Sequence, residues 1–286
     1  MSTPTFVRVF APELWGQVDK FKQFFATTHD FKPSEKKAVA GVDNHFNKAL
    51  TLNNLAAKLA PNLRLDNEEL ATKGYTAATN SSEFSAVIEG VFTELYSSID
   101  CAHTVIYALY KKCRGVPDST RKLFERAAKA ELGGDFPAPL LSALQGATWF
   151  NELRGIRDEL THSTIGASHL NSETNEISYV HHGVRRNNAP LVIDNVFKKI
   201  DEFMQGVNEF LGRVFHFLNA GLKAEPVDVA CAFAFDRVYM RKMTIADIVD
   251  FNSGICQSNH WFDKELGRRC PLADNCGAYA RAAKTT

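Results

Sequence analysis

The sequence has no net charge and no long hydrophobic run. Its 286 residues carry 33 basic and 33 acidic side chains, so nucleic acid could be held only by a local patch and not by bulk charge. No apolar run reaches the roughly 18 residues of a membrane span, and Met1 to Phe10 lacks the features of a signal peptide. There is also no glycine-rich phosphate loop, internal repeat or low-complexity tract. These absences predict a globular protein in a reducing, cytoplasmic compartment, without a membrane partner.

Helical periodicity dominates what the sequence does contain. Apolar residues recur at three- and four-residue steps over 84–113, which predicts a long amphipathic helix. Similar spacing predicts further helices from Pro12, over 42–59, over 117–132, from about 137 to 160 and over 193–222. We therefore expect a mainly α protein built as an up-and-down helical bundle.

Composition divides the chain into three expected parts. A polar linker at 76–82 separates a helical N-terminal extension, 1–80, from the bundle, 81–222. Within the bundle, the polar stretch 167–190 leads into a predicted hairpin whose strands begin near Ile177 and Leu191. The tail, 223–286, is expected to form a small cysteine-containing subdomain.

A short charged motif lies at the end of the helix predicted up to about residue 160. It reads Arg-Asp-Glu-Leu-Thr-His from Arg157 to His162. Arginine offers phosphate a permanently charged planar fork, and imidazole titrates near neutral pH, which suits proton transfer. Five residues on an ideal helix is about 140° of rotation, so Arg157 and His162 converge only if the helix distorts or two chains meet. Asp158 precedes His162 by four residues and is the candidate that orients the imidazole.

This motif at the end of a bundle helix resembles that of the HEPN family, helical bundles with an R-x4-6-H motif whose residue after arginine is polar. Residues 94–100 (Glu-Leu-Tyr-Ser-Ser-Ile-Asp) resemble the family's first bundle helix, and the likeness covers about 83–222. The resemblance implies a ribonuclease that needs no metal or other cofactor for catalysis. His162 would be the general acid or base at the 2′-hydroxyl, and Arg157 would hold the scissile phosphate.

The same resemblance implies the partners and setting. These are an RNA substrate, a homodimer that places two motifs across one cleft, and a toxin, antiviral-defence or RNA-processing role restrained by a protein partner. Arg185 and Arg186, in the polar segment, are candidate contacts for RNA phosphates, although loops of this composition are often only solvated.

Other interpretations of the bundle remain open. One is a non-catalytic RNA- or nucleotide-binding protein in which Arg157 and His162 hold a phosphate. Another is a structural adaptor whose amphipathic faces dock a partner. The motif also has a structural explanation, in which Arg154 and Asp158 form a surface ion pair and the helix dipole favours a histidine in the last turn.

The tail contains a candidate metal site. Its four soft ligands, enough for one tetrahedral zinc, are Cys256, His260, Cys270 and Cys276. The segment is short of apolar residues, and a structural zinc could supply folding free energy. The stretch from Cys270 to Cys276 also resembles the end of the iron–sulfur loop of helix-hairpin-helix DNA glycosylases. Two closely spaced cysteines of that pattern are missing, although Cys231 is in principle available. Packed, unligated cysteines are the alternative.

Overall fold

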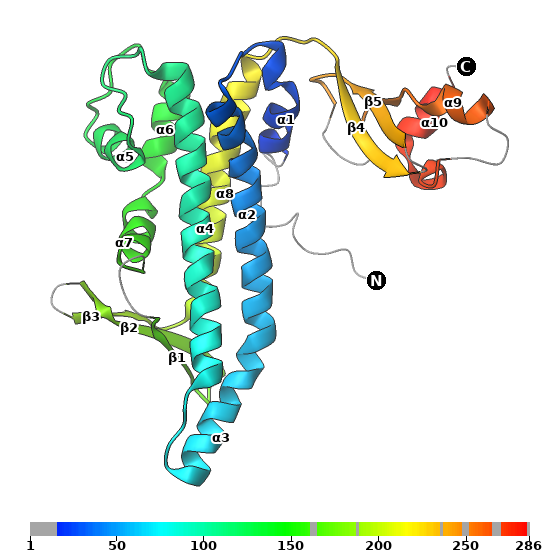
Figure 1. Cartoon of the computed structure of the whole chain (residues 1–286). Helices are drawn as coiled ribbons and strands as arrows, with labels where there is room; N and C mark the ends of the chain where they lie inside the picture. Colours follow the sequence, from blue (N-terminus) through cyan, green and yellow to red (C-terminus); the bar gives the residue numbers. More distant parts are fainter. Residues whose placement is uncertain are drawn as a thin grey trace. The chain divides into compact units, whose positions relative to one another are not determined.

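The computed structural model describes residues 16–160, 165–186, 189–234, 237–247, 252–264 and 270–284. The chain is mainly helical with two small antiparallel sheets (Figure 1), which confirms the prediction of a mainly α protein. It divides into two compact units. The described part of the first runs from Pro33 to Val214, and the second combines Leu14–Lys32 with Phe215–Thr286. Within the described ranges, no helix is long and apolar enough to cross a membrane.

Long helices form the frame of the first unit (Figure 1). They are α2 (Pro33–Leu59), α4 (Thr79–Tyr110) and, up to Val214, α8 (Val196–Ala220). The shorter elements are η4 (Ala60–Asn62), α3 (Leu63–Lys73), α5 (Thr120–Ala128), α6 (Ala138–Gly146) and α7 (Phe150–Leu160).

Helices α2 and α4 pack closely and antiparallel. The Ser98 hydroxyl donates to the Val42 carbonyl oxygen across 2.7 Å. One turn away, a Cβ on Gly41 would lie 2.5 Å from the Cys101 sulfur, so any larger residue would force the Cys101 side chain to move. The predicted separation of residues 1–80 from the bundle therefore does not match the structure, because α2 is one of the bundle's long helices.

A buried carboxylate also joins these two helices. Glu94 accepts a 2.6 Å hydrogen bond from His45 Nδ1 and a second bond from Lys48, both on α2. Burial raises the pKa of Glu94, but the hydrogen bonds and charges of His45 and Lys48 outweigh it and hold the pKa below its usual range. Glu94 is thus kept ionised between the helices.

Aromatic contacts join α8 to α4 and α5 to α7. Phe92 on α4 meets Phe203 on α8 edge to face, with ring centroids 5.9 Å apart. Phe124 on α5 stacks on Phe150 at the start of α7, with centroids 3.7 Å apart. These rings are all buried, so they anchor the start of α7 against the bundle.

The polar segment after α7 forms a sheet in the order β1 (Ala167–Leu170), β2 (Ile177–Arg186), β3 (Ala189–Ile193). The predicted hairpin corresponds to β2 and β3, and β1 is an additional strand. The sheet is fixed to α4 because Tyr179 Oη donates to Glu89 Oε1 across 2.7 Å. The Ser168 amide likewise donates to Ser81 Oγ across 3.0 Å.

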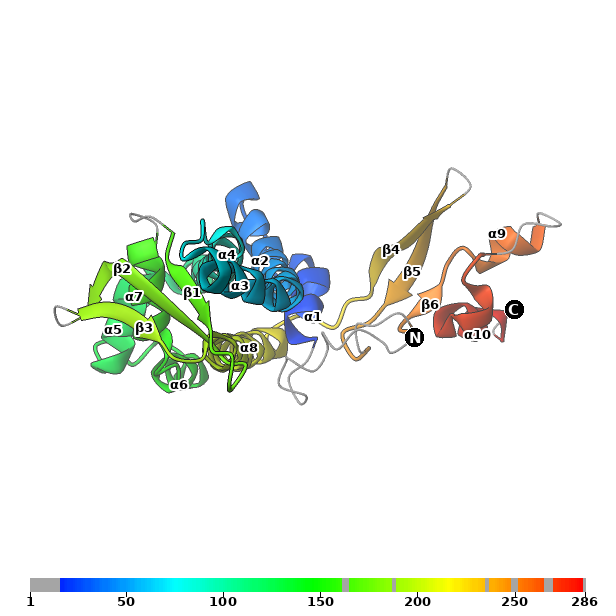
Figure 2. The same cartoon turned by 90° about the horizontal axis from the view of Figure 1, so that it is seen from below.

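The second unit holds the other sheet, in the order β4–β5–β6 (Figure 2). Its elements are α1 (Gln17–Phe24), η3 (Phe25–Thr27), β4 (Val227–Ala234), β5 (Arg237–Met243), β6 (Ile255–Cys256), α9 (Asn259–Lys264), η5 (Ala273–Asn275) and α10 (Gly277–Ala283). Phe21 packs edge to face on Phe215, with centroids 5.3 Å apart. The predicted tail therefore shares its unit with an N-terminal helix, and residues 1–80 do not form one extension.

The packing of α8 against the segment before α7 gives a test. A Cβ on Gly206 would lie 2.7 Å from Trp149 Cδ1. Gly206→Ala should therefore lower the free energy of unfolding by about 1–3 kcal/mol, because overpacking exceeds the gain in helix propensity. Gly146→Ala is the matched control, since nothing lies within 4 Å of its Cβ position. Urea unfolding of both variants measures the effect, and equal stability of Gly206→Ala and wild type would disprove the contact.

Candidate functional site

Helix α7 carries the charged residues Arg157 and Asp158 next to its buried face. Phe150, Leu153 and Ile156 are at most 1% exposed and face the bundle. The side chains of Arg157 and Asp158 are 32% and 47% exposed. The spacing of the apolar residues thus fixes which side of the helix the charges occupy.

The Arg157 guanidinium is held from two sides. Its central carbon lies 4.7 Å from the centre of the Tyr96 ring, in a cation–π contact. Its Nη1 donates to Asp158 Oδ1 across 3.1 Å. Tyr96 in turn stacks on Phe150, with centroids 6.0 Å apart. The arginine is therefore oriented by a buried aromatic ring and remains accessible to an anionic ligand.

A second arginine extends the charged surface toward α5. Arg154 Nη1 donates to Glu125 Oε1 across 3.2 Å, and its Nε lies 3.9 Å from Asp158 Oδ2. Glu125 also accepts from Arg121 Nε across 2.7 Å. The surface ion pair between Arg154 and Asp158 that the sequence suggested is therefore present, within a larger network.

Two acidic groups on α4 lie beside this network. Burial raises the pKa of Asp100, and a hydrogen bond from Thr120 and the charge of Arg157 oppose that rise. Burial also raises the pKa of Tyr96 to about 12, with a further contribution from the negative charges of Asp100 and Asp158. The site therefore combines arginine with Tyr96 and Asp100, two groups whose pKa values are raised by burial.

The other predicted residues of the bundle are described only in part. His162 lies in 161–164, outside the described residues, so the structure places Arg157 and Asp158 together without it. The backbones of Arg185 and Arg186 belong to β2, opposite Pro190 and Ala189 of β3. Their side chains are also outside the description.

The predicted metal ligands divide into two groups. One small cavity is lined by Cys256, Cys270 and Cys276, together with Cys231. His260 is exposed on α9 and does not line it. Across the described parts of the chain, no three His, Cys, Asp or Glu residues already stand in the arrangement of a metal's ligands.

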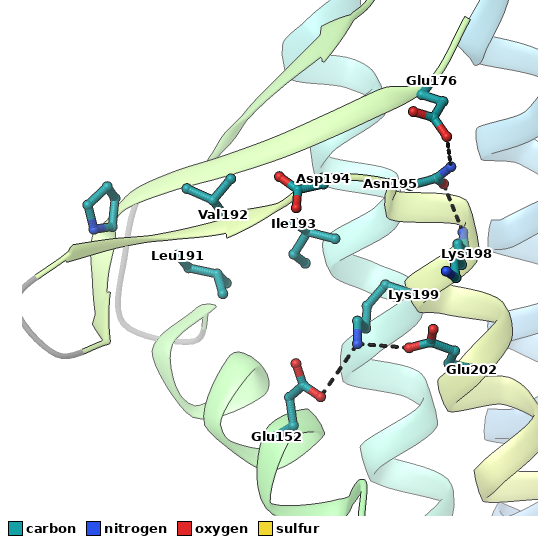
Figure 3. Close-up of a pocket in the computed structure, with 11 residues that line it drawn as sticks. Glu152, Glu176, Leu191, Val192, Ile193, Asp194, Asn195, Lys198, Lys199 and Glu202 are labelled. Atoms are coloured by element: carbon teal, nitrogen blue, oxygen red, sulfur yellow. Dashed lines mark hydrogen bonds and ion pairs between the residues drawn. The ribbon is translucent and has the colours of Figure 1, made fainter. Parts of the chain in front are cut away.

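A cavity of about 630 Å³ lies between α7, β3 and the start of α8 (Figure 3). Lys199 crosses it, 3.6 Å from Glu152 and 2.8 Å from Glu202. Neither Arg157 nor Asp158 lines it, and among its described lining residues the carboxylates outnumber the lysines. The net negative charge of this cavity repels phosphate. The candidate site for an anion is therefore the surface formed by Arg121, Arg154 and Arg157 on α5 and α7.

The candidate site contains four residues that the sequence analysis did not predict to belong to it, namely Tyr96, Asp100, Arg121 and Glu125. Tyr96 and Asp100 lie in the 94–100 segment whose likeness to HEPN proteins was noted, which was the available signal. Nothing in the local sequence indicates that α5 brings Arg121 and Glu125 to α7, because that contact depends on how the helices pack. Comparisons with protein-family models, curated proteins and solved structures found no match to this chain.

The raised pKa of Tyr96 predicts how stability changes in alkali. The unfolded chain loses this proton near pH 10, whereas the folded chain keeps it up to about pH 12. Between these values the folded state binds more protons, so wild type should lose stability relative to Tyr96→Phe by up to about 1.4 kcal/mol per pH unit. Urea unfolding of both proteins at about pH 9 and pH 11 measures this difference. A stability difference that does not change with pH would contradict the burial of the phenol.

Proposed function

We propose that this protein is an RNA endonuclease of the HEPN type that cleaves without a metal ion. One observation carries the proposal. The guanidinium of Arg157 is oriented by Tyr96 at the end of α7 and remains partly exposed, immediately before the segment that contains His162. A cation oriented in this way suits a phosphate, because less side-chain entropy is lost when the ligand binds than for an unconstrained arginine.

The proposed reaction transfers one phosphoryl group within the RNA chain. The 2′-oxygen attacks the adjacent phosphorus, the bond from phosphorus to the 5′-oxygen breaks, and the products end in a 2′,3′-cyclic phosphate and a 5′-hydroxyl. His162 takes the proton from the 2′-hydroxyl or gives one to the departing 5′-oxygen. Arg157 stabilises the negative charge that develops on the phosphate. Asp158, which already contacts Arg157, would fix the direction of the guanidinium and the orientation of the imidazole.

The reaction needs one group that takes a proton from the 2′-hydroxyl and another that gives a proton to the 5′-oxygen. A dimer of two chains would provide both groups. One histidine cannot take a proton and give one at the same moment, whereas a homodimer supplies two copies of His162 to one phosphate. We propose RNA as the substrate, Arg185 and Arg186 as further phosphate contacts, and a protein that restrains the nuclease. The toxin or antiviral-defence role remains part of this proposal.

A second candidate function is supported by the ion pairs. Arg157 is neutralised by Asp158 at 3.1 Å, and Arg154 by Glu125 at 3.2 Å. A site balanced in this way also suits reversible binding of RNA or a nucleotide without cleavage. The two functions differ in whether RNA products appear.

The cleavage experiment uses end-labelled RNA and the purified chain in excess EDTA. Wild type should produce fragments with cyclic-phosphate ends. Arg157→Ala and His162→Ala should each lower the cleavage rate by at least about 100-fold, as expected for loss of charge stabilisation or of acid–base catalysis.

Matched control variants show whether a lower cleavage rate is specific to the proposed site. His169→Ala on β1 and Arg64→Ala on α3 change exposed residues of the same types elsewhere in the first unit, and both should cleave like wild type. Cleavage by His162→Ala at the wild-type rate would overturn the assignment of the site. RNA binding without products from wild type, across several RNAs, would instead favour the binding function.

A further inference from the structure

Four cysteines of the second unit lie around one small, partly open cavity. Cys231, Cys256, Cys270 and Cys276 all line a cavity of about 10 Å³. They come from β4, β6, the turn before η5 and the residue before α10. All four are free thiols, and Tyr239 and Tyr279 pack around them in the same buried cluster. The fold therefore gathers four soft ligands that lie far apart in the sequence.

The β4–β5 hairpin turns Cys231 toward the cavity. The pairing of β4 with β5 shifts register between Ala230 and Ala232, so Cys231 is the extra residue of a bulge. A bulge redirects the side chain of its extra residue. The Cys231 thiol reaches inward and lies 3.3 Å from the Tyr239 carbonyl oxygen, to which it donates.

Strand β6 holds Cys256 in place. Cys256 pairs with Arg241 of β5, and the Gln257 amide donates to the Met240 carbonyl oxygen across 3.0 Å. The backbone amides of Ser258 and Asn259 also bond to the Cys256 sulfur. Such amide donors stabilise a thiolate, which is the form that binds metal.

The last two cysteines bracket a compact turn. The Ala273 amide donates to the Cys270 carbonyl oxygen across 3.0 Å, and the Ala280 amide donates to that of Cys276 across 3.0 Å. Cys276 is itself 8% exposed. The turn and the first turn of α10 therefore fix the backbone of both residues at one side of the cavity.

Arginines brace the segment that leads into β6. Arg281 of α10 donates through Nε to the Gly254 carbonyl oxygen across 2.9 Å and also bonds to the Asn252 carbonyl oxygen. Gly254 has a φ of +75°, and a Cβ there would lie 2.5 Å from the Lys242 carbonyl oxygen. Arg241 is 6% exposed, donates to the Ser253 carbonyl oxygen across 2.9 Å and lines the cavity.

We propose a structural Zn²⁺ site with four thiolate ligands, namely Cys231, Cys256, Cys270 and Cys276. Binding releases the four thiol protons and leaves a centre of net charge about −2, which the guanidinium of Arg241 offsets across the cavity. The thiols line the cavity and rotate about χ1 to complete the tetrahedron. Cys231 thereby replaces His260 in the ligand set that the sequence suggested.

The placement of the thiols and the size of the cavity agree with one ion. The four cysteines line the same cavity and pack against the same buried cluster, so their thiols are neighbours. A bound cation would stabilise them as thiolates. The cavity of about 10 Å³ matches a single atom of about the size of water.

The test measures metal content of the intact chain purified without chelator. Wild type should contain about one zinc per chain, and Cys231→Ser should retain less than about a tenth of that amount. His260→Ala, which changes the exposed histidine, and Cys101→Ser, which changes a thiol of the first unit, should keep the zinc of wild type. Loss of zinc from His260→Ala with retention in Cys231→Ser would overturn the ligand set.

A second measurement works even if Cys231→Ser does not fold. Wild type is exchanged with Co²⁺, which should give the charge-transfer and ligand-field absorption of a tetrahedral four-thiolate centre, with about one cobalt bound per chain. A spectrum of that kind, together with zinc in the purified protein, supports the site. Iron with acid-labile sulfide in wild type, or neither bound zinc nor a cobalt–thiolate spectrum, would overturn it.

Discussion

The close antiparallel contact of α2 with α4 is the constraint on which the first unit depends. Gly41 lets the two backbones approach at Cys101, and Glu94 is held between them by His45 and Lys48. Because one face of α4 packs on α2, its remaining faces are left to pack against α5, α7, α8 and the first sheet. The candidate site follows from this arrangement, because Tyr96 is buried where α7 crosses α4.

The acidic side chains of that site compete with any anionic ligand for its arginines. Arg157 and Asp158 form a pair that is partly exposed, so a phosphate that binds Arg157 competes with a carboxylate of the same chain. The cation–π contact with Tyr96 does not compete, since it uses the face of the guanidinium and leaves its edge for the ligand. Phosphate recognition of this kind is local, which fits a chain whose total charge is zero.

The sequence predicted what depends on periodicity and missed what depends on packing. The apolar repeat over 84–113 corresponds to α4, because a helix buries one face wherever its residues recur with its turn. Strand β1 has no such apolar repeat in its sequence. It is held against α4 by hydrogen bonds from the Ser168 amide to Ser81 and from the neighbouring Gly166 amide to Glu89. Arg157 and Asp158 were found from their spacing, but the contact with Tyr96 depends on how two helices cross. Cys231 could not be assigned from spacing, because only the bulge in β4 turns it toward the other cysteines.

The central claim is that the 2′-hydroxyl of the RNA attacks its own phosphate. The most direct measurement maps one bond that the wild-type chain cleaves and then removes the single 2′-hydroxyl next to that bond. The account predicts that cleavage stops at this bond while other bonds of the same RNA are cut as before. Continued cleavage at the deoxy position would contradict the account, since the attacking atom would then come from elsewhere.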